Sequence, residues 1–135
     1  MHMLVTGGTG FIGSALVPEF LKRGFSVTVL SRHQQPQRAG VTYVQSLESV
    51  EKAVDIVVNL AGASLAGRRW SDGYKAEMVA SRAGFTEQLV QWMRAQSNPP
   101  SLLISGSAIG FYGSSRDQFF DETSPGGSGF SAQLC

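Results

Sequence analysis

Short apolar runs alternate with stretches of helical periodicity along most of the chain. The runs lie at residues 3–5, 26–30, 41–44, 55–60 and 102–105, and each predicts a β-strand. The second, fourth and fifth runs are almost continuously apolar, which is typical of parallel strands that helices cover on both faces. This alternation predicts an α/β fold with a doubly wound parallel sheet.

Two segments have the spacing of helices. Residues 11–23 form the first, which Gly24 should end as a C-cap and which Pro18 should bend or weaken in its middle. Residues 71–96 form the second, with Ser71 as its N-cap and Asp72 in its first turn. The apolar stripe of this second helix comprises Tyr74, Met78, Phe85, Leu89 and Met93.

The most informative motif joins the first predicted strand to the first predicted helix, and reads Val5-Thr6-Gly7-Gly8-Thr9-Gly10-Phe11-Ile12-Gly13. A strand, a glycine-rich turn and a helix in this order are the context that a dinucleotide-binding loop of the Rossmann fold requires. Gly7 permits the tight turn, Gly10 lets the backbone approach a pyrophosphate, and Gly13 lets the helix pack against the strand. The helix N-terminus at Phe11 and Ile12 offers unpaired N–H groups to the phosphates. The alternative is a purely structural glycine-rich turn.

The end of the second predicted strand bears on the choice of cofactor. An acidic residue there binds the ribose of NAD, whereas an arginine accommodates the extra phosphate of NADP. The strand is followed by Ser31 and Arg32 without a carboxylate. Arg32 can grip a phosphate with its planar fork, and Ser31 can donate its hydroxyl. The pair therefore favours NADP(H) over NAD(H), with a solvated basic turn as the alternative.

The fourth predicted strand ends in small residues. Leu60, Ala61 and Gly62 follow it at the sheet edge where ligands bind in open α/β sheets, and there a backbone can lie along a ligand. An ordinary strand-to-loop turn is the alternative. On the long predicted helix, Arg82 falls within or beside the apolar stripe, so it either extends to solvent or has an anionic partner such as Glu77 or the cofactor.

Hydroxyl groups follow the fifth predicted strand. Ser107 and Tyr112 lie near its ligand end and are candidates for binding a carbonyl or hydroxyl substrate, although serines at strand ends are more often loop hydrogen-bonders. Tyr112 and Arg116 imitate a Tyr-x-x-x-Lys spacing. They fall in a glycine- and serine-rich loop, so we interpret the spacing as coincidence. A turn is expected at residues 124–127.

The composition is that of a globular protein in the soluble class. The chain has 135 residues, 42% of them hydrophobic, and a net charge of +1, which suits one domain without a nucleic-acid or membrane partner. The single cysteine, Cys135, excludes an intrachain disulfide and fits a reducing cytoplasm. No signal peptide and no Cys/His metal cluster is evident. A small-molecule substrate is the expected partner, and a homodimer is compatible with this composition.

The predicted fold also looks C-terminally incomplete. Five strands make the first half of a doubly wound dinucleotide fold and the start of its second half. A helix begins near Phe130, and the face of the sheet that it should cover would stay exposed. We therefore expect residues 1–135 to be the N-terminal, dinucleotide-binding part of a longer protein whose substrate-binding part is absent.

With these segments assembled, the chain resembles the extended and atypical short-chain dehydrogenase/reductase superfamily. Its opening glycine run is similar to that of sugar-nucleotide epimerases and dehydratases. A narrower resemblance, to the "cell division inhibitor SulA-like" branch of nucleotide-sugar epimerases, is carried by Asn59-Leu60-Ala61-Gly62-Ala63-Ser64, Gly67-Arg68-Arg69-Trp70, Ser81-Arg82, Ile104-Ser105-Gly106-Ser107-Ala108-Ile109-Gly110-Phe111-Tyr112-Gly113 and Asp121-Glu122-Thr123-Ser124-Pro125.

The resemblance implies an NADP(H)-binding Rossmann fold. It implies Ser31 and Arg32 on the adenosine phosphate, Leu60 and Ala61 along the cofactor, and Glu77 and Arg82 near it. It also places Ser107 where the superfamily keeps its catalytic Ser or Thr. These are expectations from likeness, and each concerns a residue of this chain that matches the motif.

The catalytic Tyr-x-x-x-Lys pair of the superfamily is missing at the matching place. Ser131 and Cys135 stand roughly where the Tyr and Lys should open the last helix, and neither can act as that acid–base pair. As a whole, the resemblance implies an epimerase or oxidoreductase that uses NADP(H) on a sugar nucleotide or a related hydroxyl or carbonyl compound. The alternatives are a non-catalytic NADP(H)-binding regulator or redox sensor, and an inactive remnant of a longer protein.

Overall fold

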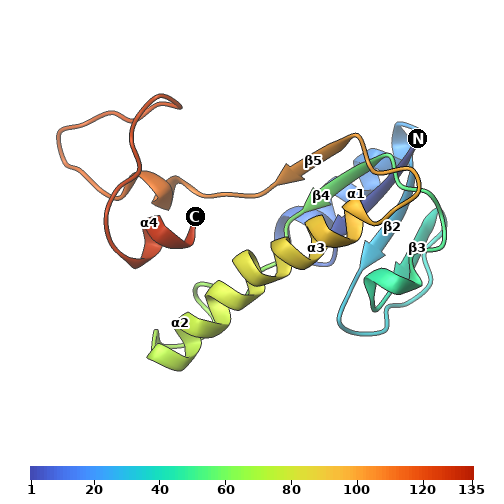
Figure 1. Ribbon diagram of the computed structural model, residues 1–135, viewed down its shortest axis with the longest axis horizontal. Helices are drawn as coiled ribbons and strands as arrows, with labels where there is room; N and C mark the ends of the chain where they lie inside the picture. The colour runs from blue at the N-terminus through green and yellow to red at the C-terminus, as the bar shows by residue number, and fades with distance from the viewer.

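A single parallel sheet organises the molecule, and the computed structural model describes residues 1–135 (Figure 1). The strands run in the order β3-β2-β1-β4-β5 and comprise β1 (His2–Thr6), β2 (Ser26–Leu30), β3 (Val41–Val44), β4 (Ile56–Asn59) and β5 (Leu102–Ser105). The chain moves outward from β1 to β3, then crosses back to β4 on the other side of β1. Strand order thus reverses between β1 and β4, and the predicted doubly wound α/β fold is confirmed.

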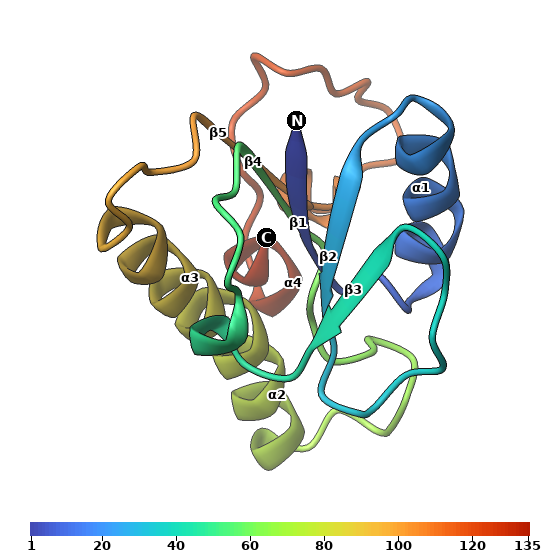
Figure 2. The same cartoon turned by 90° about the vertical axis from the view of Figure 1, so that its right-hand side faces the viewer.

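Helices cover both faces of this sheet (Figure 2). α1 (Phe11–Lys22) lies on one face, while α2 (Asp72–Val79) and α3 (Phe85–Arg94) belong to a long helical segment on the other side. Successive residues of β1 therefore point into different layers, as the period of a strand requires. Met3 and Val5 pack beneath α1. Leu4 packs on the other face, in a cluster with Leu89 of α3.

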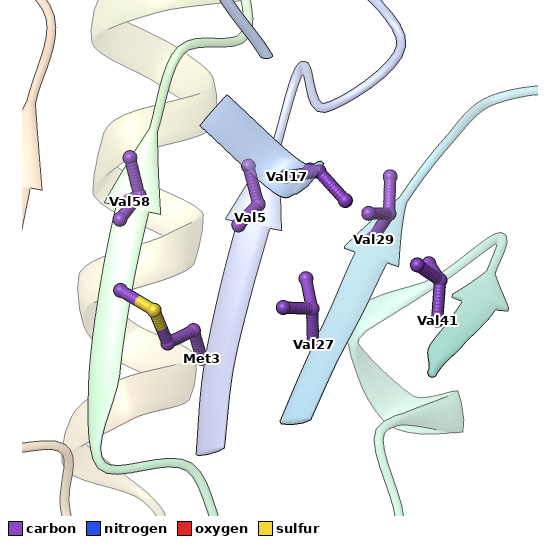
Figure 3. Close-up of a cluster of buried hydrophobic side chains, with 7 residues drawn as sticks. All are labelled: Met3, Val5, Val17, Val27, Val29, Val41 and Val58. Atoms are coloured by element: carbon purple, nitrogen blue, oxygen red, sulfur yellow. The ribbon is translucent and has the colours of Figure 1, made fainter. Parts of the chain in front are cut away.

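The layer beneath α1 is built mostly of valine. Figure 3 shows that Val17 of α1 and side chains from four neighbouring strands lie together in one cluster. The cluster comprises Met3, Val5, Val17, Val27, Val29, Val41 and Val58. β-branched side chains suit a pleated, buried surface. Because helices cover both faces of the sheet, most residues of β1, β2 and β4 are buried, including the polar Thr6, Thr28 and Asn59.

α1 ends in the glycine cap that its sequence predicts. Gly24 has a φ of 79°, and the amides of Gly24 and Phe25 donate to the carbonyls of Leu21 and Phe20 at 3.0 and 3.1 Å. The rings of Phe20 and Phe25 meet edge to face, with centroids 6.3 Å apart. This combination is a Schellman motif with its hydrophobic contact. Pro18 lies inside the helix, which continues through it without a break.

The helix predicted over residues 71–96 is present, but its middle is wound differently. The Ser71 hydroxyl accepts the Tyr74 amide at 3.3 Å, so the predicted N-cap is confirmed. Between α2 and α3, the segment Ala80–Gly84 forms a π-helical turn, whose hydrogen bonds span five residues. The periodicity did not predict this turn, because the apolar stripe has no member between Met78 and Phe85 that would mark the local pitch.

β5 is an edge strand and is less buried than its apolar sequence predicts. Leu102 and Ile104 are 47% and 48% exposed, whereas Leu103 packs beneath α3. The two exposed side chains belong to the α1 face of the sheet, and α1 packs over β1 and β2 instead. The expected uncovered sheet face therefore lies at Leu102 and Ile104.

Beyond β5 the chain leaves the sheet and carries η3 (Ile109–Tyr112) and α4 (Phe130–Leu134), which pack against each other (Figure 1). The turn expected at 124–127 forms three residues earlier, where the Ser124 amide donates to the Asp121 carbonyl. The Asp121 carboxylate accepts the Thr123 hydroxyl and amide, and these bonds hold the pKa of Asp121 below its usual value. The side-chain bonds of Asp121 therefore determine where the turn forms, and the Pro-Gly pair that follows does not.

None of the helices has the length and apolar character needed to cross a membrane.

Candidate dinucleotide-binding site

The glycine-rich loop packs between the end of β4 and the start of α1. Gly7 has a φ of 68°, and a Cβ there would lie 2.6 Å from the Leu60 carbonyl oxygen, so only glycine fits. A Cβ on Gly13 would lie 2.4 Å from the Gly7 oxygen, which shows how closely α1 approaches the loop. The structure gives Gly7 and Gly13 the turn and packing geometry that the motif predicts. Contact of the loop with a cofactor stays a prediction.

The first turn of α1 is open. Gly10 is its N-cap and donates its own amide to the Gly7 carbonyl at 3.0 Å. The amides of Phe11, Ile12 and Gly13 have no acceptor within the chain, as expected of a helix start. The Phe11 side chain is 97% exposed and does not fold back over these amides. Three unpaired donors at the positive end of a helix dipole fit a pyrophosphate.

A buried hydrogen-bond network links the strand ends beneath the loop. Thr6 Oγ1 donates to Asn59 Oδ1 at 2.6 Å and accepts the Ala61 amide at 3.2 Å. Asn59 Nδ2 donates to Thr86 Oγ1 of α3 at 2.9 Å and to Ser105 Oγ of β5 at 3.3 Å. Thr6 and Asn59 are 1% and 5% exposed. The network therefore joins β1, β4, β5 and α3, with its centre at Thr6 and Asn59 shielded from water and its outer partner Ser105 exposed.

Sequence reasoning missed this network, although a signal was present. Thr6 directly follows the apolar run 3–5, Asn59 is the next-to-last residue of the run 55–60, and Ser105 ends the run 102–105. The parallel register pairs Thr6 with Asn59 and Asn59 with Ser105. Polar residues that end neighbouring parallel strands share one edge of the sheet, which is where ligands bind in open α/β folds. The polar residues at or next to the ends of these runs would have identified the three residues together.

Ser31 and Arg32 are placed differently at the end of β2. Ser31 is 7% exposed, and its Oγ donates to the His33 carbonyl at 2.9 Å and accepts from Gln35 Nε2 at 3.1 Å. The hydroxyl thus shapes the turn, and the phosphate contact predicted for it would compete with these bonds. Arg32 is exposed, and its guanidinium makes no hydrogen bond or ion pair in the structure.

The segment after β4 lies directly against the glycine loop. A Cβ on Gly7 would be 2.9 Å from the Ala61 nitrogen as well as close to Leu60, so Leu60 and Ala61 border the open start of α1. Gly62 is exposed and is next to Arg82, since a Cβ on Gly62 would lie 2.9 Å from the Arg82 Cζ. The residues predicted along the cofactor thus form one continuous edge.

Neither extension to solvent nor a pairing with Glu77 describes Arg82. Arg82 does not extend to solvent alone, because its Nη2 donates to the Ala63 carbonyl at 3.0 Å. Glu77 does not pair with it either, and instead forms an ion pair with Arg68 at 3.6 Å. The reason is local winding, since the π turn directs Arg82 at the loop after β4. Glu77 is exposed on α2 and is free to meet a loop arginine.

Ser107 and Tyr112 lie on the segment after β5. Ser107 is exposed before η3, and Tyr112 ends η3. The Tyr112 ring stacks on Phe120, with centroids 5.5 Å apart and an interplanar angle of 11°, so its face is turned toward the loop after η3. No hydrogen bond joins Ser107 to Tyr112. Arg116 lies beyond η3 in irregular chain, so no helix connects it with Tyr112.

The positions that the resemblance assigns to the Tyr and Lys do lie beside this segment. A Cβ on Gly110 of η3 would be 3.6 Å from Cys135 Sγ and 3.8 Å from Ser131 Cβ. Ser131 and Cys135 therefore share the side of α4 that is turned to η3. Neither side chain carries the phenol or the amine that the acid–base pair needs. No group of three or more His, Cys, Asp or Glu side chains lies close enough together to hold a metal ion.

A parallel sheet of order 3-2-1-4-5, with a glycine loop and an open helix start where the strand order reverses, defines a Rossmann-type dinucleotide-binding domain. Comparison with known proteins then assigns the family. Residues 3–131 match the NAD dependent epimerase/dehydratase family, and the chain belongs to it. This confirms the expected short-chain dehydrogenase/reductase relationship at the level of that family.

The curated relatives are longer proteins. The epimerase family protein SDR39U1 of Mus musculus is 36% identical over 129 residues, which are 94% of this chain and 43% of that protein. The epimerase family protein YfhF of Bacillus subtilis is 35% identical over 131 residues, which are 92% of this chain and 43% of that protein. This chain spans less than half the length of these relatives.

Solved structures agree with the assignment. Human SDR39U1 (isoform 2), determined with NADPH, superposes with a TM-score of 0.86 at 34% identity, over 99% of this chain and 46% of that one. The nucleoside-diphosphate sugar epimerase from Corynebacterium glutamicum superposes with a TM-score of 0.78 at 27% identity, over 100% of this chain and 28% of that one. The chain is thus an NAD(P)-binding epimerase-family protein.

Proposed function

We propose that this chain is the NADP(H)-binding part of an epimerase-type oxidoreductase that acts on a sugar nucleotide or a related hydroxyl or carbonyl compound. One observation carries the choice of cofactor. Arg32 is exposed and unpaired at the end of β2, where NAD-binding sites hold a carboxylate. A planar guanidinium can grip the 2′-phosphate of NADP(H) with two parallel hydrogen bonds. The NADPH in the human SDR39U1 structure supports the same choice.

Different residues of the site would bind different parts of the dinucleotide. Arg32 would hold the 2′-phosphate, and the amides of Phe11, Ile12 and Gly13 would hold the pyrophosphate. The backbone from Leu60 to Gly62 would lie along the nicotinamide half. When bound, the nicotinamide exchanges a hydride with a substrate carbon. We propose that Ser107 binds the reacting oxygen of the substrate and that Tyr112 contributes a second hydroxyl, with the remainder of the substrate held outside this chain.

Calorimetric titration with NADPH and NADH tests the cofactor. We expect tighter binding of NADPH, and Arg32→Ala should weaken it about 10- to 100-fold because charge-assisted hydrogen bonds to the phosphate are lost. NADH binding should not change. Arg23→Ala is the matched control, since Arg23 is also exposed but lies at the C-cap of α1, at the opposite end of that helix from the glycine loop. A preference for NADH, or an equal effect of Arg23→Ala, would contradict the proposal.

The second candidate is a non-catalytic NADP(H)-binding regulator. Ser131 and Cys135 favour it, because they lie beside η3 where the superfamily needs its acid–base pair. Nicotinamide absorbance, followed with a panel of nucleotide sugars, distinguishes the two. Turnover that Ser107→Ala abolishes supports the enzyme, whereas NADPH binding without any turnover supports the regulator. The assay is best repeated on a protein that continues past residue 135, as the relatives do.

A further inference from the structure

The π-helical turn presents two neighbouring side chains to a single residue of the loop after β4. Ser81 Oγ accepts the Ala63 amide at 2.9 Å, and Arg82 Nη2 donates to the Ala63 carbonyl at 3.0 Å. Both backbone polar groups of Ala63 are therefore paired with side chains from one helical turn. Loop residues usually leave such groups to solvent, so this pairing holds the loop in a single position.

The two side chains are themselves anchored on the helix. Ser81 Oγ donates to the Met78 carbonyl at 3.0 Å, and Arg82 Nη1 donates to the same carbonyl at 3.4 Å. Met78 is fully buried, so this anchor does not move with the surface. Arg82 is half-buried and has no carboxylate partner, because Glu77 pairs with Arg68. The two hydrogen bonds of its guanidinium both go to backbone carbonyls, and the charge of the donor makes these bonds stronger than neutral ones.

The loop after β4 is held from both sides. On the helix side the guanidinium of Arg82 lies against Gly62, where a Cβ would be only 2.9 Å from Cζ. On the other side Gly7 leaves no room for a side chain between itself and the Leu60 carbonyl. A shift of Arg82 would therefore be transmitted through Gly62 and Ala63 to the edge that borders the glycine loop.

The strand order indicates which half of a bound dinucleotide would lie next to the loop after β4. Arg32 ends β2, the glycine loop follows β1, and the loop in question follows β4, on the opposite side of β1 from β2. A dinucleotide that binds across the reversal of strand order, with its adenosine phosphate at Arg32, has its nicotinamide half over the end of β4. We propose that Ser81 and Arg82 are positioning residues that hold the loop after β4 in the shape that receives the nicotinamide half. This inference rests on the proposed NADP(H) site.

Two ligands separate this role from general destabilisation. NADPH spans the whole site, whereas adenosine 2′,5′-bisphosphate has the 2′-phosphate and stops before the nicotinamide ribose. We expect Ser81→Ala and Arg82→Gln each to weaken NADPH binding about 5- to 10-fold, the worth of one or two hydrogen bonds, and to leave the bisphosphate within about twofold. Arg32→Ala should weaken both ligands. Arg94→Gln, an exposed arginine at the end of α3, should weaken neither.

A ligand-free measurement completes the test. The Ala63 amide should exchange its hydrogen slowly in the wild-type chain and much faster in Ser81→Ala, with the amides of β4 unchanged. Equal weakening of NADPH and the bisphosphate, or unchanged NADPH affinity in both variants, overturns the inference, as does fast exchange at Ala63 in the wild type. If the wild type binds no NADPH while Ala63 is protected, the proposed cofactor is wrong and the anchored loop remains.

Discussion

Replacement of Asn59 by leucine tests whether the polar network, and not the apolar core alone, holds the strand ends together. The Asn59 side chain makes hydrogen bonds at 2.6, 2.9 and 3.3 Å to Thr6, Thr86 and Ser105. Each is worth about 1 kcal/mol net, so their loss predicts a fall of about 3 kcal/mol in the free energy of unfolding. Thr6, at 1% exposure, would keep a hydroxyl without an acceptor. A loss of about 3 kcal/mol is a large share of the total free energy of unfolding of a typical domain, which is roughly 5–15 kcal/mol.

Urea unfolding followed by circular dichroism measures this loss. Asn98→Leu makes the same chemical change at an exposed position after α3, and should stay within about 0.5 kcal/mol of the wild type. Thr6→Val should be destabilising alone and should add less than its own cost in the Asn59→Leu background, with a coupling of about 1 kcal/mol. A loss for Asn59→Leu below about 1 kcal/mol, or strict additivity with Thr6→Val, would refute the reasoning.

Three further predictions concern stability and aggregation. Burial first, then Lys52 and the N-terminal amine, lower the pKa of His2 from 6.5 against the opposing effect of Asp55, so the unfolded chain takes the proton first. Stability should therefore fall as the pH drops below about 6.5, and His2→Gln should flatten that dependence. Gly13→Ala should cost about 1–3 kcal/mol by overpacking, whereas Gly73→Ala, in open space on α2, should stabilise by about 0.5–1 kcal/mol. Ile104→Thr should reduce aggregation in light scattering, because the exposed face of an edge strand loses an apolar group.

Each of these predictions has an outcome that contradicts it. For His2, an unchanged pH profile in His2→Gln would place the titrating group elsewhere. For the glycines, equal effects in thermal melts at positions 13 and 73 would mean that close packing does not decide the result. For Ile104, unchanged scattering at equal protein concentration would assign the aggregation to another surface.

Much of the fold follows from local patterns. The strands at residues 26–30, 41–44 and 102–105 have the predicted bounds, and β1 and β4 differ from prediction by one residue at each end. Ser71 and Gly24 act as the predicted helix caps, because capping depends on a side chain and its immediate neighbours. The π turn and the exposure of β5 were not predictable in this way. Both depend on what packs against the element rather than on its own residues.

In the candidate site, too, some features follow from local sequence and others depend on packing. By itself the sequence determined the glycine loop, the open start of α1 and the arginine after β2, because these are properties of neighbouring residues and of backbone conformation. Only the tertiary structure decided that Ser31 is occupied inside its turn, that Arg82 serves the loop after β4, and that Asn59 joins three strands and a helix. A long side chain can reach several partners, and the partner that it meets is chosen by the packing of distant segments. The sequence pattern records where a polar group stands along the chain but not what faces it.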